Sequence, residues 1–105
     1  MRVVILASAE SDLSELRSYI TSNFSPSVWR KTYKKIKKTI RNLSTFPYLG
    51  GVPPELERFA LQQYRQVISG MNRILYEVRQ EVVYVHAIID TRRDVQAFLL
   101  RRLLR

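Results

Sequence analysis

Apolar positions follow two different periods along the chain, and each period predicts its own kind of element. Residues 2–7, RVVILA, are a short run rich in β-branched side chains, long enough for a buried strand and too short for a helix. After it, apolar side chains recur every three or four positions, which predicts an amphipathic helix. Ser8 is expected to cap this helix, with Glu10 and Asp12 near the positive end of its dipole. The apolar stripe consists of Ala9, Leu13, Leu16, Ile20 and Phe24.

A second helix is expected after the break FSPS. Ser25 is a suitable N-cap, and Pro26 fits the first helical position, where its missing N–H costs nothing. The two helices should form a hairpin with a basic outer face. Its apolar stripe is Trp29, Tyr33, Ile36, Ile40 and Leu43, and the rest of the cylinder carries Arg30, Lys31, Lys34, Lys35, Lys38 and Arg41.

The second half of the chain predicts an antiparallel meander. Residues 46–56, FPYLGGVPPEL, have loop chemistry because they contain three prolines and two glycines, with a single helical turn expected around residues 55–58. Strand-like segments follow at 62–68, 71–78 and 82–89, joined by hairpin-length connections. The last of these segments is apolar on both faces, which indicates a central strand.

A short terminal helix should follow the turn TRRD. Its apolar stripe is Val95, Phe98, Leu99 and Leu103, and Arg101, Arg102 and Arg105 lie near its negative end. This helix is more simply used to cover the sheet than to lie on a membrane. The expected fold is α+β with the order β-α-α-β-β-β-α, in a single domain over residues 1–105, because one core serves a chain of this length.

Composition excludes several function classes. The chain has no cysteine and one histidine, so it has neither disulfides nor a thiolate metal site, and no metal or cofactor is expected. No apolar run approaches the roughly 20 residues that span a bilayer, and VVIL is too short for a signal peptide. A cytoplasmic protein without a membrane partner is therefore expected.

Charge changes this picture by indicating a polyanionic partner. The formal net charge is +9, from 18 basic against 9 acidic residues, which favours nucleic acid or an acidic protein segment. All five lysines lie within residues 31–38, whereas every basic residue after Gly51 is arginine, whose planar donor suits bidentate contacts with phosphate or carboxylate. The lysine cluster has two interpretations, a solvated helix face or a surface that attracts DNA or an acidic partner.

The order of several phrases resembles the RelE/ParE superfamily of toxins from type II toxin–antitoxin modules. The carriers are the first strand with ASAESDLSELRSYI, then LSTFPYLGGVPPEL, YRQVISGMNRILYEV and VVYVHAIIDTRRDV, and a short terminal helix. The phrases FPYLG, NRILYEV and TRRD are more similar to ParE-like than to RelE-like members. The resemblance implies a helical hairpin packed on an antiparallel sheet, and a toxin silenced by a cognate antitoxin in a hetero-oligomer. It also implies DNA gyrase as the target of ParE-like members, and ribosome-bound mRNA as the substrate of RelE-like members.

The resemblance also implies candidate site residues. Arg65 matches a basic position on the second strand, Arg73 the arginine of the third, and Arg92 or Arg93 the arginine after the fourth. Val67 replaces a second basic residue of the ribonucleases, Asp90 replaces a histidine, and no tyrosine follows Tyr84. Target binding is therefore expected of Arg65, Arg73, Arg92, Arg93, Arg101 and Arg102. Antitoxin binding is expected of Leu13, Leu16, Ile20, Trp29, Tyr33 and Ile36, around which a disordered antitoxin segment would fold.

Chemistry weighs against RNA cleavage. Attack by a 2′-hydroxyl needs a proton acceptor and a donor, and arginine cannot act as the base. The remaining groups are Tyr64, Tyr76, Tyr84 and His86, and His86 is expected to be a packed or hydrogen-bonded core residue. The favoured function is gyrase inhibition without covalent chemistry. The alternatives are an mRNA endoribonuclease, with Arg65, Arg73 and Arg92 holding the scissile phosphate, and a non-toxic binding module.

Arg73 itself has two interpretations. Strand alternation places it on one face with Met71, Leu75 and Glu77. It could form a cross-strand ion pair at the rim of the sheet. Alternatively, Arg65, Arg73 and Arg92 could converge on one concave face of the sheet and hold a ligand.

Overall fold

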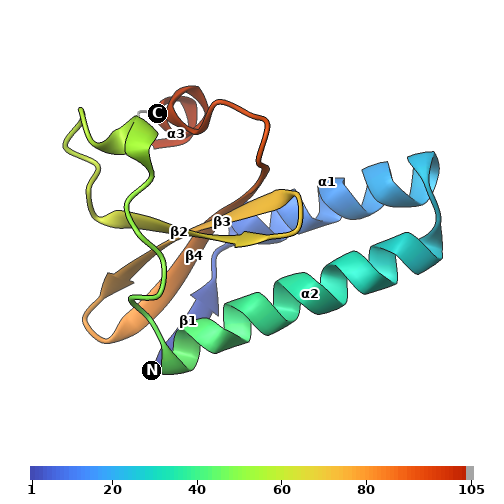
Figure 1. Ribbon diagram of the computed structural model, residues 1–105, viewed down its shortest axis with the longest axis horizontal. Helices are drawn as coiled ribbons and strands as arrows, with labels where there is room; N and C mark the ends of the chain where they lie inside the picture. The colour runs from blue at the N-terminus through green and yellow to red at the C-terminus, as the bar shows by residue number, and fades with distance from the viewer. Residues whose placement is uncertain (104–105) are drawn as a thin grey trace.

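One four-stranded sheet organises the fold (Figure 1). The structure is a computed structural model, and it describes residues 1–103, so Arg105 lies outside the described residues. The sheet order is β1-β4-β3-β2, with β1 parallel to β4 and the other pairs antiparallel. The expected element order is confirmed. The elements are β1 (Arg2–Ile5), α1 (Ala7–Asn23), α2 (Pro26–Thr45), a 3₁₀ turn η1 (Pro54–Leu56), β2 (Tyr64–Ser69), β3 (Asn72–Arg79), β4 (Val82–Asp90) and α3 (Val95–Leu103).

β4 is an interior strand, as its apolar character on both faces predicts. It lies between β1 and β3, and its partner on the parallel side comes from the start of the chain, with Val3 opposite Val83. Parallel neighbouring strands need a long crossover connection. The chain from β1 to β4 contains α1, α2, β2 and β3, and in the sheet β3 and β2 follow on the other side of β4. This topology places the chain's first and last strands side by side, with β1 at one edge of the sheet.

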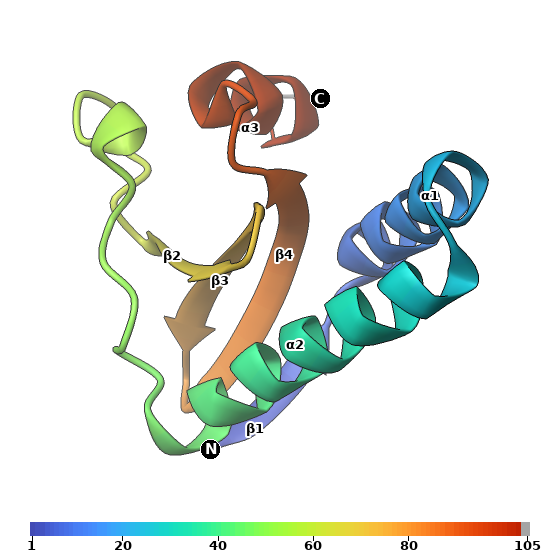
Figure 2. The ribbon, with the colours of Figure 1, turned by 45° about the vertical axis from the view of Figure 1, so that its right-hand side comes forward.

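The sheet has a separate hydrophobic core on each face. Figure 2 shows α1 and α2 on one side of the curved sheet and α3 with η1 on the other. The hairpin core is built around Ala9, Leu13, Ile36, Ile40, Leu43, Ile74, Tyr76, Val83 and Val85. The α3 core contains Leu56, Tyr64, Leu75, Ala87, Ile89, Val95, Phe98 and Leu99.

A β-bulge in β4 changes which side chains face each core. Leu75 pairs with Ala87, but the next residue of β3, Tyr76, pairs with Val85, so His86 is the extra residue. An extra residue shifts the alternation of side chains by one position. The bulge therefore lets both ends of β4 contribute apolar side chains to the hairpin core.

The predicted caps had different outcomes. Ser25 is confirmed as the N-cap of α2, because its Oγ accepts a hydrogen bond from the N–H of Val28 at 3.2 Å. The prediction for Ser8 is wrong: α1 begins at Ala7, and the Ser8 hydroxyl donates to the carbonyl of His86 at 2.9 Å. The helix begins one residue before Ser8, so Leu6 takes the N-cap position, without a side-chain hydrogen bond.

Two-residue loops close both hairpins of the meander. Gly70 and Met71 join β2 to β3, and Gly70 has a φ of 59°, which glycine adopts without strain. Gln80 and Glu81 join β3 to β4 with φ values of 51° and 63°, although neither is glycine. The 3₁₀ turn covers residues 54–56 rather than the expected 55–58. Within residues 1–103, no helix combines the length and the apolar content that crossing a membrane requires.

Candidate functional site

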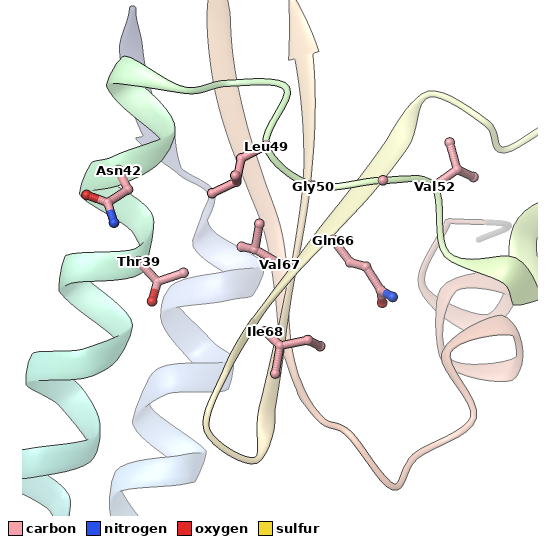
Figure 3. A pocket seen from close by; sticks show the side chains of 9 residues that line it. Thr39, Asn42, Leu49, Gly50, Val52, Gln66, Val67 and Ile68 are labelled. Carbon is pink, nitrogen blue, oxygen red and sulfur yellow. The ribbon is translucent and has the colours of Figure 1, made fainter.

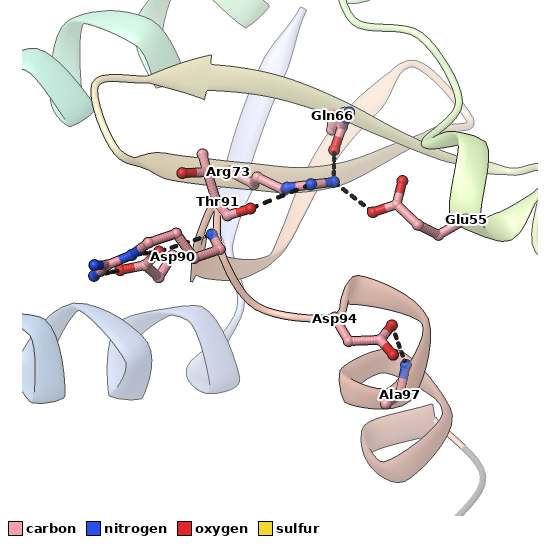
Figure 4. A network of polar contacts seen from close by, with 8 residues as sticks. Glu55, Gln66, Arg73, Asp90, Thr91, Asp94 and Ala97 are labelled. Carbon is pink, nitrogen blue, oxygen red and sulfur yellow. Dashed lines mark hydrogen bonds and ion pairs between the residues drawn. The ribbon is translucent and has the colours of Figure 1, made fainter.

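Arg73 lies at the centre of a polar network that joins three segments (Figure 4). Its Nη1 donates to Glu55 Oε2 at 2.7 Å and to Gln66 Oε1 at 3.1 Å, and its Nη2 donates to the carbonyl of Thr91 at 3.3 Å. The side chain is only 18% exposed. An ion pair at the sheet rim is therefore confirmed, but its carboxylate comes from η1 and not from a neighbouring strand. The guanidinium ties η1, β2 and the β4–α3 turn together.

Arg65 lies on the opposite face of the sheet from Arg73. In the β2–β3 register Arg65 is paired with Tyr76, whereas Arg73 is paired with Ile68. The Arg65 Nη1 donates to the carbonyl of Gly50 at 2.6 Å, and its guanidinium lies 4.9 Å from the centre of the Tyr48 ring. The expectation that Arg65, Arg73 and Arg92 converge on one concave face is wrong.

The length of the loop between β2 and β3 predicts that Arg65 and Arg73 lie on opposite faces of the sheet. Two strands joined by a two-residue loop pair each odd-numbered residue with an even-numbered one, and directly paired residues share a face. Arg65 and Arg73 are both odd-numbered, so they must lie on opposite faces. Adjacency of the strands was therefore not sufficient to predict a shared site.

Arg92 forms a closed pair with Asp90 within the β4–α3 turn. Its Nε and Nη2 donate to the two carboxylate oxygens of Asp90 at 2.9 and 2.7 Å. These hydrogen bonds, with that from the Arg92 backbone, lower the pKa of Asp90 to about 2. The Arg92 side chain remains 71% exposed. This pair shapes the turn while leaving the guanidinium accessible from outside.

Arg102 connects α3 to α1 and β4. Its Nη2 and Nη1 donate to the carboxylate of Asp12 at 2.8 and 3.0 Å, and Nη1 also donates to the carbonyl of His86 at 3.1 Å. Its guanidinium lies 4.2 Å from the centre of the Phe98 ring. The same Asp12 carboxylate accepts the N–H of Ile88 at 3.0 Å. Arg102, expected to bind a target, is thus occupied in positioning the terminal helix.

A groove along α1 brings together the remaining candidate arginines. Three hollows of about 440, 420 and 450 Å³ adjoin one another here. The first two share Asp12, Glu15 and Arg93 in their walls, and the last two share Leu16, Tyr19 and Arg92, among others. The basic residues that line this α1 groove are Lys35, Arg92, Arg93, Arg101 and Arg102.

The far end of the α1 groove is apolar and exposed. Tyr19 of α1 is 54% exposed and Phe24, the C-cap of α1, is 65% exposed. Val28 of α2 is 41% exposed, and Met71 of the β2–β3 loop is 58% exposed. All four line the same hollow. Exposed apolar patches of this kind mark interaction surfaces. No periodicity argument placed Met71 in the same hollow as residues of α1, because this arrangement depends on tertiary packing.

The six residues expected to bind an antitoxin do not share one surface. Leu13, Ile20 and Ile36 are 8%, 7% and 0% exposed, and Leu13 and Ile36 belong to the hairpin core. Leu13, Tyr33 and Ile36 line a hollow of about 140 Å³ between α1 and α2, while Leu16 and Ile20 line the α1 groove. The Trp29 ring stacks on the Tyr33 ring, with 5.2 Å between the ring centroids.

His86 is a hydrogen-bonded residue of the sheet, as expected. Its Nε2 lies 2.9 Å from Glu77 Oε1, and both side chains are less than one-fifth exposed. Its ring packs edge-on against Tyr64 at 5.1 Å. Burial, with a smaller effect of Glu77, raises the pKa of Tyr64, and burial raises the pKa of Tyr76. Both phenols therefore stay protonated, and neither is a ready proton acceptor.

A further hollow lies between α2 and β2 (Figure 3). It has a volume of about 500 Å³ and is lined by Thr39, Asn42, Leu49, Gly50, Gly51, Val52, Gln66, Val67 and Ile68. None of these residues has an ionisable side chain, so the hollow offers no acid–base chemistry. In residues 1–103, no group of three or more His, Asp or Glu side chains could hold a metal ion.

Comparison with known proteins identifies the family. Residues 3–95 match the family described as the ParE toxin of the type II toxin–antitoxin system, parDE. The chain belongs to this ParE toxin family. The fold is similar to a structure of the chromosomal ParDE system from P. aeruginosa, with a TM-score of 0.72, 14% identity, and 86% of this chain and 95% of that chain covered.

A second similar structure comes from a related module. It is the RelBE2 toxin–antitoxin complex from Mycobacterium tuberculosis, with a TM-score of 0.57, 21% identity, and 85% of this chain and 95% of that chain covered. The resemblance to the RelE/ParE superfamily, closer to ParE than to RelE, is thereby confirmed. No curated protein matches the sequence. The chain is a type II toxin of the ParE/RelE kind.

Proposed function

We propose that this ParE-family toxin inhibits DNA gyrase by binding it through the α1 groove, and that a cognate antitoxin neutralises it. The observation that carries the proposal is the grouping of exposed arginines along this groove, beside the exposed apolar side chains at its far end. Arg92, Arg93 and Arg101 are exposed on its α3 side, and the acidic side chains in its walls are Asp12, Glu15 and Asp90. Docking by charge and apolar contact needs no acid–base pair.

The ribonuclease alternative finds less support in the geometry. Arg65 and Arg73 lie on opposite faces of the sheet, and Arg73 is bound by the carboxylate of Glu55. A phosphate clamp would need both guanidinium groups on one side. The His86 ring is engaged by Glu77. The arrangement therefore favours a toxin that binds its target over one that cleaves RNA.

A supercoiling assay tests the proposal. Purified toxin is added to gyrase and relaxed plasmid, and a parallel translation reaction is read for cut mRNA. The test variant changes Arg92, Arg93 and Arg101 to Gln, and the charge-matched control changes the exposed Arg2, Arg17 and Arg58 to Gln. We expect the toxin to block supercoiling with accumulation of linear DNA, and the groove variant to lose roughly tenfold or more in potency while the control keeps it.

Each other outcome contradicts part of the proposal. Cut mRNA with gyrase unaffected would identify an endoribonuclease. Equal potency of the groove variant and the wild type would remove the α1 groove as the gyrase surface. Neither activity, in a chain whose expression is harmless without an antitoxin, would identify a non-toxic binding module.

We further propose that the antitoxin covers the accessible apolar side chains of the hairpin. Leu16, Trp29 and Tyr33 are available for this role, together with Phe24 at the open end of the α1 groove. Phe24→Ala and Tyr33→Ala are expected to weaken antitoxin binding by roughly tenfold each, because aromatic anchors dominate such interfaces. Phe46→Ala is the matched control, since Phe46 is 61% exposed at the other end of α2. Unchanged affinity of both test variants, measured by calorimetry, would contradict this assignment.

A further inference from the structure

The outer face of α2 carries an unneutralised positive charge. The helix spans Pro26–Thr45 and contains no acidic residue. It contains seven basic residues, all of them exposed, and none of them forms an ion pair with another described residue. By contrast, α1 mixes Glu10, Asp12 and Glu15 with a single arginine. The seven are Arg30, Lys31, Lys34, Lys35, Lys37, Lys38 and Arg41.

Helical geometry gathers these charges on one stripe. At about 100° per residue, the seven side chains fall within an arc of about 160°. The centre of this arc is nearly opposite the buried stripe formed by Ile36, Ile40 and Leu43. From Arg30 to Arg41 the stripe is about 16 Å long. Figure 1 shows α2 lying along the outside of the molecule, so a partner can approach the whole stripe.

The chemistry of the stripe fits phosphates better than an acidic protein. Five of the seven residues are lysine, a hydrated point charge that binds phosphate without fixed bidentate geometry. The remaining residues of the arc are polar: Ser27, Asn42 and Thr45. The core of a protein interface is enriched in aromatic residues and depleted in lysine. Surfaces that bind single-stranded nucleic acid also carry aromatic side chains on which the bases stack. The basic arc of α2 has no aromatic residue.

We propose that the outer face of α2 binds the phosphate backbone of duplex DNA, without reading its sequence. The positive charge of this surface comes from residues of α2 alone and does not depend on the proposed function. The choice of DNA rather than duplex RNA rests on the proposed function, because a gyrase-bound toxin works beside duplex DNA. Such a contact would hold the toxin on the DNA that surrounds its protein target.

A binding titration without gyrase tests this surface separately from the proposed function. A fluorescent 30-base-pair duplex is titrated with the toxin at several salt concentrations, and fluorescence anisotropy gives the affinity. The test variant changes Lys31, Lys34 and Lys38 to Gln, and the control changes Arg2, Arg17 and Arg58 to Gln, so both lose the same charge. The test variant should bind on the order of a hundredfold more weakly at about 0.1 M salt, with its salt slope reduced by about 2 to 3. All three residues are exposed, and circular dichroism verifies that the variant is folded.

Binding by the control variant, and binding of other polyanions to the toxin, show whether the α2 face is specific for duplex DNA. The Arg2, Arg17, Arg58 control should lose much less affinity, and two duplexes of unrelated sequence should bind equally within about twofold. An equal loss in the control would show that only net charge matters and would overturn the proposal. So would tighter binding of duplex RNA, or of a poly-glutamate peptide of equal charge. Absence of DNA binding would overturn it too, and gyrase inhibition, measured separately, would be unaffected by that result.

Discussion

Asp12 and Arg102, 90 residues apart in the chain, hold α3 against α1 through hydrogen bonds of 2.8 and 3.0 Å. Asp12 also accepts the N–H of Ile88, so one carboxylate joins three elements. Replacing Asp12 by Ala leaves the Ile88 N–H without its acceptor, and leaves the partly buried guanidinium of Arg102 with only the carbonyl of His86. We expect Asp12→Ala to lower the free energy of unfolding by about 2–4 kcal/mol.

Denaturant unfolding measures this prediction. Asp12→Asn keeps an acceptor for Ile88 and should cost less than Asp12→Ala. Glu15→Ala is the matched control, because Glu15 is exposed on the same helix and should change stability by less than about 0.5 kcal/mol. Equal stability of Asp12→Ala and Glu15→Ala would show that the contact between Asp12 and Arg102 does not hold α3.

The ion pair between Arg73 and Glu55 makes a second prediction. Arg73→Met keeps much of the apolar stem but releases η1 and the turn at Thr91, and we expect a loss of about 1–3 kcal/mol. A double-mutant cycle with Glu55→Gln should give a coupling energy of about 1 kcal/mol. Arg79→Met is the control, because the Arg79 side chain is 61% exposed. Loss of toxin activity in Arg73→Met without loss of stability would instead make Arg73 a residue that contacts the target.

Gly50 and Gly51 offer a pair of neighbouring glycines with opposite expectations. A Cβ on Gly50 would lie 2.7 Å from the carbonyl carbon of Gln66 and 3.0 Å from the Tyr76 hydroxyl, whereas a Cβ on Gly51 would meet nothing within 4 Å. The N–H of Gly50 also donates to the Tyr76 hydroxyl at 2.9 Å in a buried site. Gly50→Ala should therefore cost about 2–3 kcal/mol, and Gly51→Ala close to zero. Thermal unfolding of the two variants distinguishes them, and equal melting temperatures would contradict the close approach.

The helices and strands depend on local sequence patterns, and for this reason the sequence predicts them. The stripe of α2, the cap at Ser25 and the apolar character of β4 each depend on residues close together in the chain. The cap at Ser8 failed for a tertiary reason, because its hydroxyl bonds to His86 on β4. Local sequence propensity cannot predict a hydrogen-bond partner 78 residues away in the chain.

The candidate site was less predictable because it depends on register and on side-chain partners. Loop length alone separates Arg65 from Arg73, but the bulge at His86 has no signature in the sequence. Nothing local indicates that Arg102 bonds to Asp12, or that Met71 and Phe24 line the same hollow. The sequence therefore indicated which arginines to consider, and only the structure shows which of them remain exposed.

Asp90 and Arg92 make the last prediction, which concerns pH. Hydrogen bonds from Arg92 lower the pKa of Asp90 from 3.8 to about 2, so the folded state favours the charged carboxylate. A depressed carboxyl pKa contributes stability that is fully present above pH 3.8 and is lost as pH falls through about 2. Because Arg92 is 71% exposed, solvent and salt screen the pair, so the contribution to stability should be small.

An NMR titration of the Asp90 carboxyl carbon measures the pKa directly. Arg92→Gln should raise the Asp90 pKa toward 3.8, and so should high salt in the wild type. Arg93→Gln is the control, since Arg93 acts on Asp90 only through a weak charge effect and should shift this pKa much less. A wild-type Asp90 that titrates near 3.8 would show that the turn does not hold this pair in solution. The β4–α3 turn, and with it the arginine side of the α1 groove, would then be looser than the hydrogen bonds indicate.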